Sequence, residues 1–534
     1  MSAVLSTATL APLPSLLPLL GAAGTLVLGR RPRAQRLVSV GVLSVVVAVS
    51  LTLLVLADRN GTTAVQVGGW LPPIGITLVV DRLSALMLVV ASTVLLAVMV
   101  FAIGQGIRDG DDRQPVSIFQ PTYLVLAAGV ANAFLAGDLF NLYVGFEVLL
   151  AASYVLLTVG GSEDRIRAGV SYVVVNLTSS VVFLVGIAFC YAATGTLNLA
   201  EMAVRMDQVP NGTRTALFAV LLVAFCLKAA VFPLSAWLPD SYPTAPAPVT
   251  AVFAGLLTKV GVYAIIRTHS LLFPGGELDG VLLVAALATM LVGILGAIAQ
   301  NDVKRLLSFT LVSHIGYMVF GIALSTRAGL SGSIYYVAHH IVVQTALFLV
   351  VGIIERQGGS ASLRRLGGLG AVSPLLGVLF LLPGLNLGGI PPFSGFLGKT
   401  LLLQAGVADG SVLAWALVVG SVATSLLTLY VVARVWTKAF WRPRDDAPEG
   451  HLADDGPVEV VPGAANTAVA QRAVVGSIPV GMLVPTIGMV LVSLSLTVLA
   501  GPLIGYTDRA AGDLLDRSVY ISTVLGDTTS GGPR

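Results

Sequence analysis

The sequence predicts an all-α polytopic membrane protein, because it is too apolar for a soluble domain and its apolar residues come in long runs. Hydrophobic residues make up 56% of the 534 residues and charged residues only 11%, whereas soluble domains carry about 25% charged residues. The runs are about 20 residues long, the length of helix that crosses a bilayer. The net charge of +3 gives no reason to expect a nucleic-acid partner.

About fourteen apolar runs reach that length. The stretch 122–159 is too long for one crossing, and Gly137 and Asp138 mark the turn that divides it. We therefore expect spans over 9–29, 36–57, 81–104, 122–138, 139–159, 168–192, 214–233, 246–272, 279–300, 305–325, 329–354, 372–403, 411–436 and 472–500.

Loop charges predict the orientation, because loops on the cytoplasmic side carry an excess of Lys and Arg. If both termini lie outside, the inside loops hold eighteen basic residues and the outside segments nine, Arg267 among them. We therefore expect both termini outside.

Two spans are expected to be broken. One carries Lys228 and then Pro233, and the other carries GGIPPF just before Lys399. Proline removes a backbone donor and kinks or ends a helix, and paired broken helices are typical of inverted-repeat transporters. The expected organisation is three N-terminal spans in 1–121, five-helix repeats in 122–272 and 279–436, a cytoplasmic loop over 437–471, and a last span with a polar tail in 472–534.

The chain lacks the signatures of an ATP-driven or redox enzyme. It has no phosphate-binding loop, no dinucleotide glycine fingerprint and no zinc-ligand cluster. Its two cysteines lie in apolar segments and indicate small buried residues. We expect no cofactor, no metal and no catalytic residue. A membrane enzyme or a structural scaffold is the alternative class, and the buried charges argue against it.

Those buried charges are the strongest functional signal. Lys228, Lys259 and Lys399, three of the five lysines, lie inside apolar stretches, as does Glu147. A charge at bilayer depth costs roughly 3 kcal/mol or more, so these residues indicate an ion or proton path. The alternative is that a lysine near a helix end extends to the headgroups, and Lys399 is most open to that interpretation.

Other polar residues are accessory candidates. His339 and His340 lie in the middle of an apolar run, where they are either relay groups or hydrogen-bonded core residues. His314 is a weaker candidate of the same kind. Asp138 and Asp240 sit beside turns and are either helix caps or part of an ion entrance.

Several segments together resemble a known family. They are AGDLFNLYVGFEVLLAASYVLL, VVVNLTSSVVFLVGIAFCYAATGTLNLAEM, LKAAVFPLSAWLPDSYPTAPAPV, NDVKRLLSFTLVSHIGYM and GGIPPFSGFLGK. The sequence resembles, over about 70–436, the antiporter-like proton-translocating family. That family includes the large membrane-arm subunits of respiratory complex I and the D-type subunit of the multisubunit Mrp cation/proton antiporter. The segments GDLFNLYVGFEV and TGTLNLAEM resemble the Mrp members more closely.

The resemblance implies roles for the matching positions. Glu147 and Lys228 match a glutamate and a lysine thought to open and close as a pair, and Lys259 matches a basic relay group. The His339–His340 region and Lys399 match the later part of the path. Gln344 departs from the family, because relatives often have a lysine there and an amide carries no charge.

The implied function is that of a secondary-transporter subunit, not an enzyme. It would exchange protons for a monovalent cation, expected to be Na⁺, together with other Mrp subunits. The alternative is a proton-pumping membrane-arm subunit of complex I (NADH-quinone oxidoreductase) or of a membrane-bound hydrogenase. The Ala, Val, Gly and Arg bias is typical of a GC-rich bacterial genome, so we expect the bacterial plasma membrane.

Overall fold

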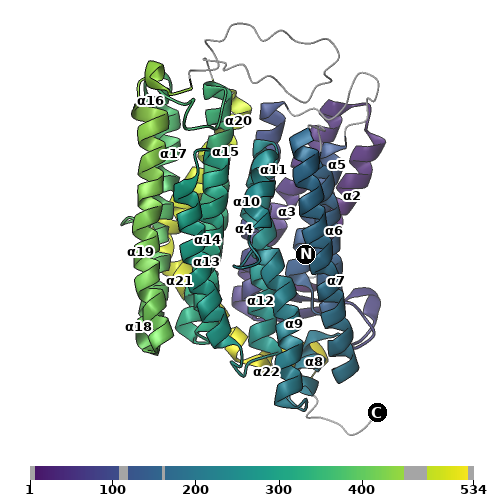
Figure 1. The fold of residues 1–534 in the computed structure, drawn as a ribbon. Coiled ribbons are helices and arrows are strands. Elements are labelled where there is room, and N and C mark those ends of the chain that lie inside the picture. Colours follow the sequence, from purple (N-terminus) through teal and green to yellow (C-terminus); the bar gives the residue numbers. More distant parts are fainter. Residues whose placement is uncertain (1–5, 107–117, 159–162, 450–477, 527–534) are drawn as a thin grey trace.

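The computed structural model describes residues 6–106, 118–158, 163–449 and 478–526. Long helices lie side by side and form one bundle (Figure 1). Within the described residues, twelve helical segments are long and apolar enough to cross a membrane. Two further apolar helices, α5 (Phe119–Leu135) and α17 (Pro374–Gly388), are shorter. The helical membrane fold is confirmed, and the count of about fourteen spans stays a prediction.

The N-terminal part holds three long helices and a small hairpin. Strands β1 and β2 pair antiparallel, with Thr63 opposite Val80. This hairpin was not predicted from the sequence. The elements are α1 (Thr7–Leu10), α2 (Leu13–Val27), α3 (Pro32–Asn60), β1 (Thr63–Gln66), η1 (Val67–Gly69), β2 (Thr77–Val80) and α4 (Arg82–Gln105).

The next block confirms the turn predicted at Gly137 and Asp138, because α5 ends at Leu135 and α6 begins at Leu139. It also contains the first expected break. Helix α9 ends at Ala229, and a short irregular stretch precedes α10. The elements after α5 are α6 (Leu139–Thr158), α7 (Glu163–Thr194), α8 (Leu199–Met206), α9 (Asn211–Ala229), α10 (Trp237–Ser241), η2 (Tyr242–Thr244), α11 (Ala247–Val252), the π-helix η3 (Phe253–Leu257) and α12 (Thr258–Leu271).

The following block contains the second break. The span expected over 372–403 is two helices, α17 and α18, separated at the GGIPPF segment. The elements are α13 (Asp279–Ala299), α14 (Val303–Ala323), α15 (Arg327–Gly358), α16 (Leu369–Val372), α17, α18 (Ser394–Asp409), α19 (Val412–Val435), the π-helix η4 (Trp436–Trp441) and η5 (Arg444–Asp446). That the two blocks form an inverted repeat stays a prediction.

The C-terminal part is more helical than expected. The polar tail expected after the 472–500 span lies largely in α21 (Ala500–Leu515) and α22 (Arg517–Leu525), which follow α20 (Val480–Val498). Residues 450–477, which include most of the expected 437–471 loop and the start of the expected 472–500 span, lie outside the described residues, as do 1–5, 107–117, 159–162 and 527–534.

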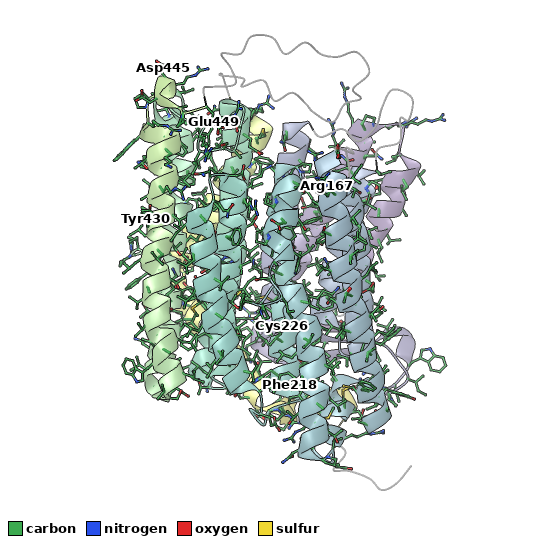
Figure 2. The ribbon with its side chains drawn as sticks, in the orientation of Figure 1. Arg167, Phe218, Cys226, Tyr430, Asp445 and Glu449 are labelled. Carbon is green, nitrogen blue, oxygen red and sulfur yellow. The ribbon has the colours of Figure 1, made fainter. Side chains whose placement is uncertain are left out.

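Burial separates central from peripheral helices. The apolar windows of α15 and of the α11–α12 segment are 100% buried in the bundle, and that of α14 is 94% buried, whereas that of α19 is 39% buried. We call the end of the bundle where α8 and α22 lie the α22 face (Figure 1). Arg167, Asp445 and Glu449 lie at the opposite face (Figure 2). The central helices are the ones that carry most of the candidate site.

Candidate ion-relay site

Lys228 is buried in the last turn of α9, directly before the first break. Its side chain is 4% exposed, and the next residue but one, Ala230, is left-handed with φ 58°. Its Nζ donates to the Asn176 carbonyl at 3.2 Å and to Ser180 Oγ at 3.0 Å, both on α7. The ammonium lies 5.8 Å from the centroid of the Phe146 ring. Lys228 therefore has polar partners but no carboxylate contact within 4.0 Å among the described residues.

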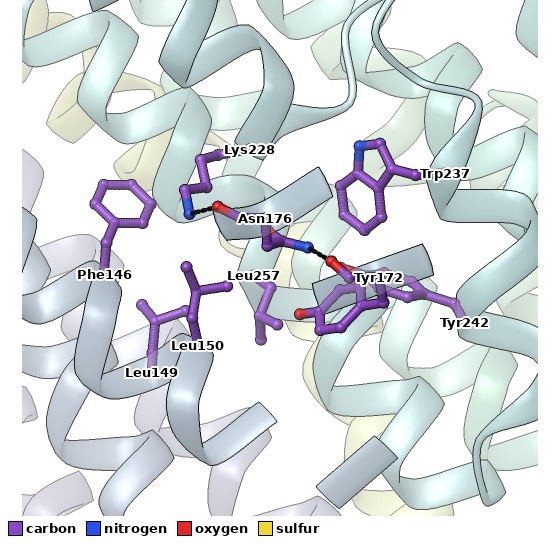
Figure 3. Close-up of a pocket in the computed structure, with 9 residues that line it drawn as sticks. All are labelled: Phe146, Leu149, Leu150, Tyr172, Asn176, Lys228, Trp237, Tyr242 and Leu257. Atoms are coloured by element: carbon purple, nitrogen blue, oxygen red, sulfur yellow. Dashed lines mark hydrogen bonds between the residues drawn. The ribbon is translucent and has the colours of Figure 1, made fainter. Parts of the chain in front are cut away.

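A small cavity extends from Lys228 toward the break. Lys228, Phe146, Asn176, Tyr172 and Trp237 line it, together with Tyr242 and three leucines (Figure 3). Aromatic rings from α7 and from the segment after the break form one wall, since the Tyr172 ring lies 5.6 Å from that of Trp237 and 6.3 Å from that of Tyr242. The cavity thus lies between Lys228, before the break, and Trp237 and Tyr242, after it.

Glu147 lies on α6, directly after Phe146, and is half-buried. Its Oε1 atom is buried and has no hydrogen-bond partner within the described part of the chain. The carboxylate is close enough to Lys228 for the two charges to interact, but the two groups do not form a closed ion pair. Their role as a coupled pair stays a prediction.

Lys259 is fully buried and lies in the first turn of α12, directly after a π-helical turn. Its Nζ donates to the Ala254 carbonyl at 2.6 Å, five residues earlier in the π-helix η3. A π-turn is wider than an α-turn and is often found at functional sites. The irregular backbone supplies the acceptor for this ammonium.

The three histidines of α14 and α15 form one cluster, together with a tyrosine that was not predicted. The His314 Nδ1 atom lies 2.6 Å from the Tyr336 hydroxyl, and the rings of His314 and His340 are 5.1 Å apart. The Tyr336 ring lies 5.3 Å from that of His339, whose Nδ1 is 2.9 Å from Ser394 Oγ on α18. His314 is thus a central member, although the sequence ranked it below the other two.

The cluster retains unused hydrogen-bonding capacity. All four residues are buried, yet within the described residues both ring nitrogens of His340 and the Nε2 atoms of His314 and His339 have no partner. Buried polar atoms of this kind are commonly satisfied by internal water. The chemistry of the cluster therefore suits a hydrated path for protons.

Lys399 is buried at the second break and does not reach the surface. Its side chain is 4% exposed. Its Nζ donates to the carbonyls of Leu387 at 2.9 Å and Gly388 at 3.2 Å, the last residues of α17. Tyr317 connects it to the cluster, because the ammonium lies 5.1 Å from the Tyr317 ring and that ring lies 5.3 Å from Tyr336. This burial argues against the alternative that Lys399 extends to the headgroups.

The remaining candidates lie apart from this chain of contacts. Gln344 donates to the Leu307 carbonyl at 2.8 Å. Asp138 lies at the turn on the α22 face and accepts a hydrogen bond from the backbone N–H of Asn141 at 2.6 Å. Asp240 forms an exposed ion pair with Arg305 at 2.7 Å. Arg267, expected in an outside segment, is instead buried against Asp81, and no sequence signal singled it out.

The two tyrosines that the sequence analysis did not predict have a weak signal in the sequence. Tyr336 precedes His339 and His340 by three and four residues, which places it on the same face of a helix. Tyr317 follows His314 by three residues in the same way. Helical spacing from each histidine would have found both tyrosines, whereas the contact between α14 and α15 is not visible in the sequence.

Fold and site together define a polytopic membrane protein with buried ionisable side chains at breaks in its helices. The chain belongs to the NADH:quinone oxidoreductase/Mrp antiporter transmembrane family, whose model matches residues 136–428. It is 37% identical over 517 residues to the D-type subunit of the Na(+)/H(+) antiporter of Alkalihalophilus pseudofirmus, covering 96% of this chain and 98% of the relative.

Solved structures agree with this assignment. A chain in the structure of the Mrp complex from Dietzia sp. DQ12-45-1b superposes with a TM-score of 0.86 at 32% identity, covering 97% of this chain and 99% of that one. A chain of respiratory complex I from Thermus thermophilus superposes with a TM-score of 0.74 at 25% identity, covering 95% and 99%.

Proposed function

We propose that this chain is a D-type subunit of a multisubunit Na⁺/H⁺ antiporter and carries its proton path. The relative named as an antiporter subunit spans nearly the whole chain. The solved structure with the TM-score of 0.86 is of an Mrp complex. The similarity to a complex I chain is lower in identity and in TM-score, so a membrane-arm subunit of complex I is the second choice.

The observation that carries the proposal is the run of buried contacts from His340 to Lys399. His340 contacts His314, which hydrogen-bonds Tyr336. Tyr336 contacts Tyr317, and Lys399 lies over the Tyr317 ring. A purely structural core rarely gathers so many ionisable groups, because each buried polar group costs free energy unless it is satisfied. The path proposed is Glu147 and Lys228, then Lys259, then the histidine cluster, then Lys399.

Lys228 is the switch of this path in the proposal. Burial weakens the hold of a lysine on its proton, and a nearby carboxylate strengthens it. Glu147 has a free carboxylate oxygen on the neighbouring α6. Approach of Glu147 would keep the proton on Lys228, and separation would release it to Lys259. Such a pair is a two-state element that a partner subunit or a cation site can bias.

The proposal places the protein in the bacterial plasma membrane with other subunits of the antiporter. Both termini would lie outside, which makes the α22 face the outer face. Na⁺ is the proposed exchanged cation, in keeping with the name of the relative from Alkalihalophilus pseudofirmus.

Exchange in everted membrane vesicles tests the proposal. Lys228→Ala in the assembled complex should abolish sodium-driven proton movement, because it removes the ammonium that lines the cavity beside the break. Lys438→Ala is the matched control, since Lys438 lies in η4 at the edge of the bundle, and it should retain exchange. Near-normal exchange by Lys228→Ala, with the complex present at normal levels, contradicts the proposal.

A further inference from the structure

A buried ion pair joins Arg267 of α12 to Asp81, apart from the contacts of the proposed relay. Arg267 Nη1 and Asp81 Oδ2 are 2.6 Å apart, and their side chains are 3% and 5% exposed. Arg267 also donates to the Tyr263 hydroxyl at 3.2 Å, and its guanidinium lies 5.5 Å from the Tyr263 ring and 5.3 Å from the Tyr520 ring. Asp81 precedes α4, and Arg267 lies near the end of α12 at the α22 face.

The pair forms part of the wall of a cavity at that face. Asp81, Arg267, Asp513, Arg517 and Tyr520 line it with several other residues. The cavity reaches the surface, since the side chains of Asp513 and Arg517 are 27% and 18% exposed. Three donors around it have no partner in the described part of the chain, namely Arg267 Nε, Arg517 Nε and the Tyr520 hydroxyl. Unpaired donors beside a surface cavity are sites for water.

Helix geometry aligns this cavity with Lys259. Lys259, Tyr263 and Arg267 follow one another at intervals of four residues, so they share one face of α12. Eight residues of helix separate the Cα atoms of Lys259 and Arg267 by about 12 Å. A hydrated cavity that leads toward a buried relay lysine is a route for uncontrolled proton entry. Arg267 and Tyr263 stand between the two.

The arginine can block this route but cannot transfer protons along it. Guanidinium does not give up its proton in proteins, so Arg267 cannot pass one on. Fixed positive charge in a narrow passage excludes protons and cations. Asp81 compensates this charge only in part, because its other oxygen accepts the backbone N–H of Ser84 at 2.8 Å and the carboxylate faces the N-terminus of α4.

We propose that Arg267 is an electrostatic barrier that keeps protons in the cavity of the α22 face from reaching Lys259. Asp81 positions the guanidinium, and Tyr263 and Tyr520 hold it between their rings. The barrier rests on the proposed function, because it protects the relay lysine of that path. Its consequence is separate, however, since it concerns passive leak in the absence of exchange.

The test is passive proton leak in proteoliposomes that contain the assembled complex and no sodium. A pH gradient is imposed, and its decay is followed with an internal pH dye. Arg267→Gln should increase the decay rate several-fold, and Arg267→Lys should not. The double variant Asp81→Asn/Arg267→Gln should leak as well, whereas Asp81→Asn alone, which keeps the positive charge, should not.

Two further variants complete the test. Arg82→Gln is the matched control, because Arg82 lies next to Asp81 and pairs with Asp58 and Asp513 instead. It should not leak. Lys259→Ala in the Arg267→Gln background should return the leak to the wild-type rate.

If the pH gradient decays as fast in Asp81→Asn as in Arg267→Gln, the leak follows loss of the ion pair and the barrier proposal is wrong. Absence of leak in the double variant also contradicts the proposal. That variant replaces both charges with amides, so it keeps the test decisive if Arg267→Gln alone fails to assemble. Failure of the proposed function has a different readout, which is sodium-driven exchange that survives Lys228→Ala.

Discussion

The three lysines of the proposed relay each donate to a backbone carbonyl, and for Lys259 and Lys399 that carbonyl lies in a π-helix or at a helix end. Lys259 uses the π-helix η3, and Lys399 uses the last carbonyls of α17. Lys228 lies at the end of α9 and donates to a carbonyl of α7. A neutral carbonyl satisfies an ammonium without adding a countercharge, so it holds the proton less firmly than a carboxylate does.

Lys304 provides the contrast within the same chain. Its Nζ pairs with Glu355 Oε1 at 2.7 Å, and both side chains are largely buried. This direct contact with a carboxylate differs from the neutral partners of the other three buried lysines. Lys304 therefore suits a structural link between α14 and α15, and the unpaired lysines suit proton transfer.

Substitution of Lys399 separates a relay group from a structural cation. Lys399→Ala should abolish or strongly slow exchange, and Lys399→Arg should not restore it, because arginine keeps the charge but does not release the proton. Sodium-driven exchange in everted vesicles is the measurement, with the amount of assembled complex as the reference. Wild-type exchange in Lys399→Arg would mean that position 399 needs only a positive charge.

At the scale of helices and turns, the sequence predicted what depends on local pattern. The division of 122–159 at Gly137 and Asp138 is confirmed, because a span has a limited length and the turn residues lie between two apolar runs. The breaks near Pro233 and GGIPPF are confirmed for the same local reason. By contrast, the predicted 372–403 span combined two helices, since both flanks of the break are apolar.

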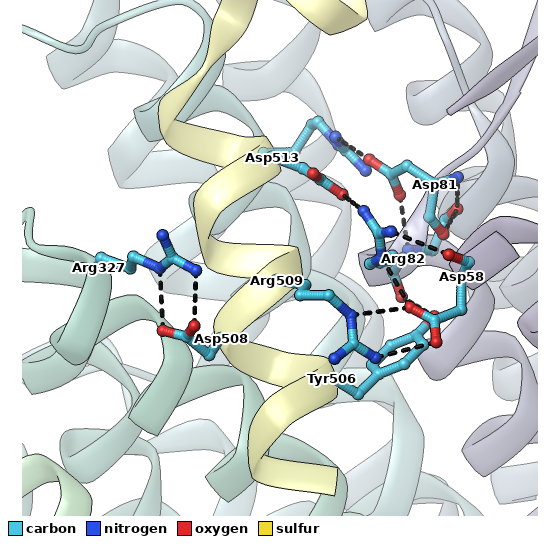
Figure 4. A network of polar contacts seen from close by, with 10 residues as sticks. Asp58, Asp81, Arg82, Arg327, Tyr506, Asp508, Arg509 and Asp513 are labelled. Carbon is cyan, nitrogen blue, oxygen red and sulfur yellow. Dashed lines mark hydrogen bonds and ion pairs between the residues drawn. The ribbon is translucent and has the colours of Figure 1, made fainter. Parts of the chain in front are cut away.

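Elements without an apolar run were missed. Helix α21 carries Asp508, Arg509 and Asp513, which pair with residues at the ends of α3, α4 and α15 (Figure 4). The residues of the candidate site were likewise predicted only where the local sequence shows them. Buried lysines could be predicted because a charge in an apolar run is conspicuous. The carbonyl partners, the tyrosine contacts and the Asp81–Arg267 pair depend on helices that are distant in sequence.

The turn between α5 and α6 carries a pH-dependent contribution to stability. Asp138 lies beyond the end of α5, outside the spans. Burial raises the pKa of its carboxyl from 3.8 to about 6, against the hydrogen bond from the backbone N–H of Asn141, which lowers it. Because this pKa is higher in the folded than in the unfolded protein, the folded state is stabilised by the protonated carboxyl. The protein therefore loses stability as the pH rises from about 4 through 6.

Asp138→Asn removes this cost and keeps an oxygen that can accept the Asn141 N–H. The variant should gain about 2 kcal/mol of stability at pH 8, since one pKa unit corresponds to about 1.4 kcal/mol and loss of the charged cap offsets part of the gain. The gain should shrink as the pH falls through 6. Thermal unfolding of the purified complex at pH 8 and pH 5 measures it, and an equal shift at both pH values would contradict the assignment.

At the scale of the whole molecule, α21 and α22 tie distant parts of the chain together across the α22 face. Along α21, Arg509 pairs with Asp58 of α3, Asp513 with Arg82 of α4, and Asp508 with Arg327 of α15 (Figure 4). Arg517 of α22 pairs with Asp207 after α8. These contacts connect the N-terminal helices with α8 and α15, so the tail acts as a strap over the helices of the proposed relay.

Neighbouring residues of α21 differ in how their charges are shared, because Asp508 pairs with Arg327 and Arg509 shares Asp58 with Arg82, and this difference is testable. Asp508 and Arg327 form an isolated bidentate pair at 2.6 and 2.9 Å. Asp508→Arg should therefore lower the unfolding temperature of the complex, and the exchanged pair Asp508→Arg/Arg327→Asp should restore it. An acidic residue at position 327 also suits the N-terminus of α15.

Asp58 binds both Arg82 and Arg509, so exchange of charges between Asp58 and Arg509 should fail. Arg509→Asp should destabilise the complex by placing two carboxylates together, and Arg509→Asp/Asp58→Arg should not rescue it, because the new arginine faces Arg82. Thermal unfolding at low and high salt measures both pairs. The losses should shrink at high salt, since these exposed charges are screened. Rescue of neither pair would show that α21 is held by its packing and not by its ion pairs, and rescue of both would contradict the sharing of Asp58 between two arginines.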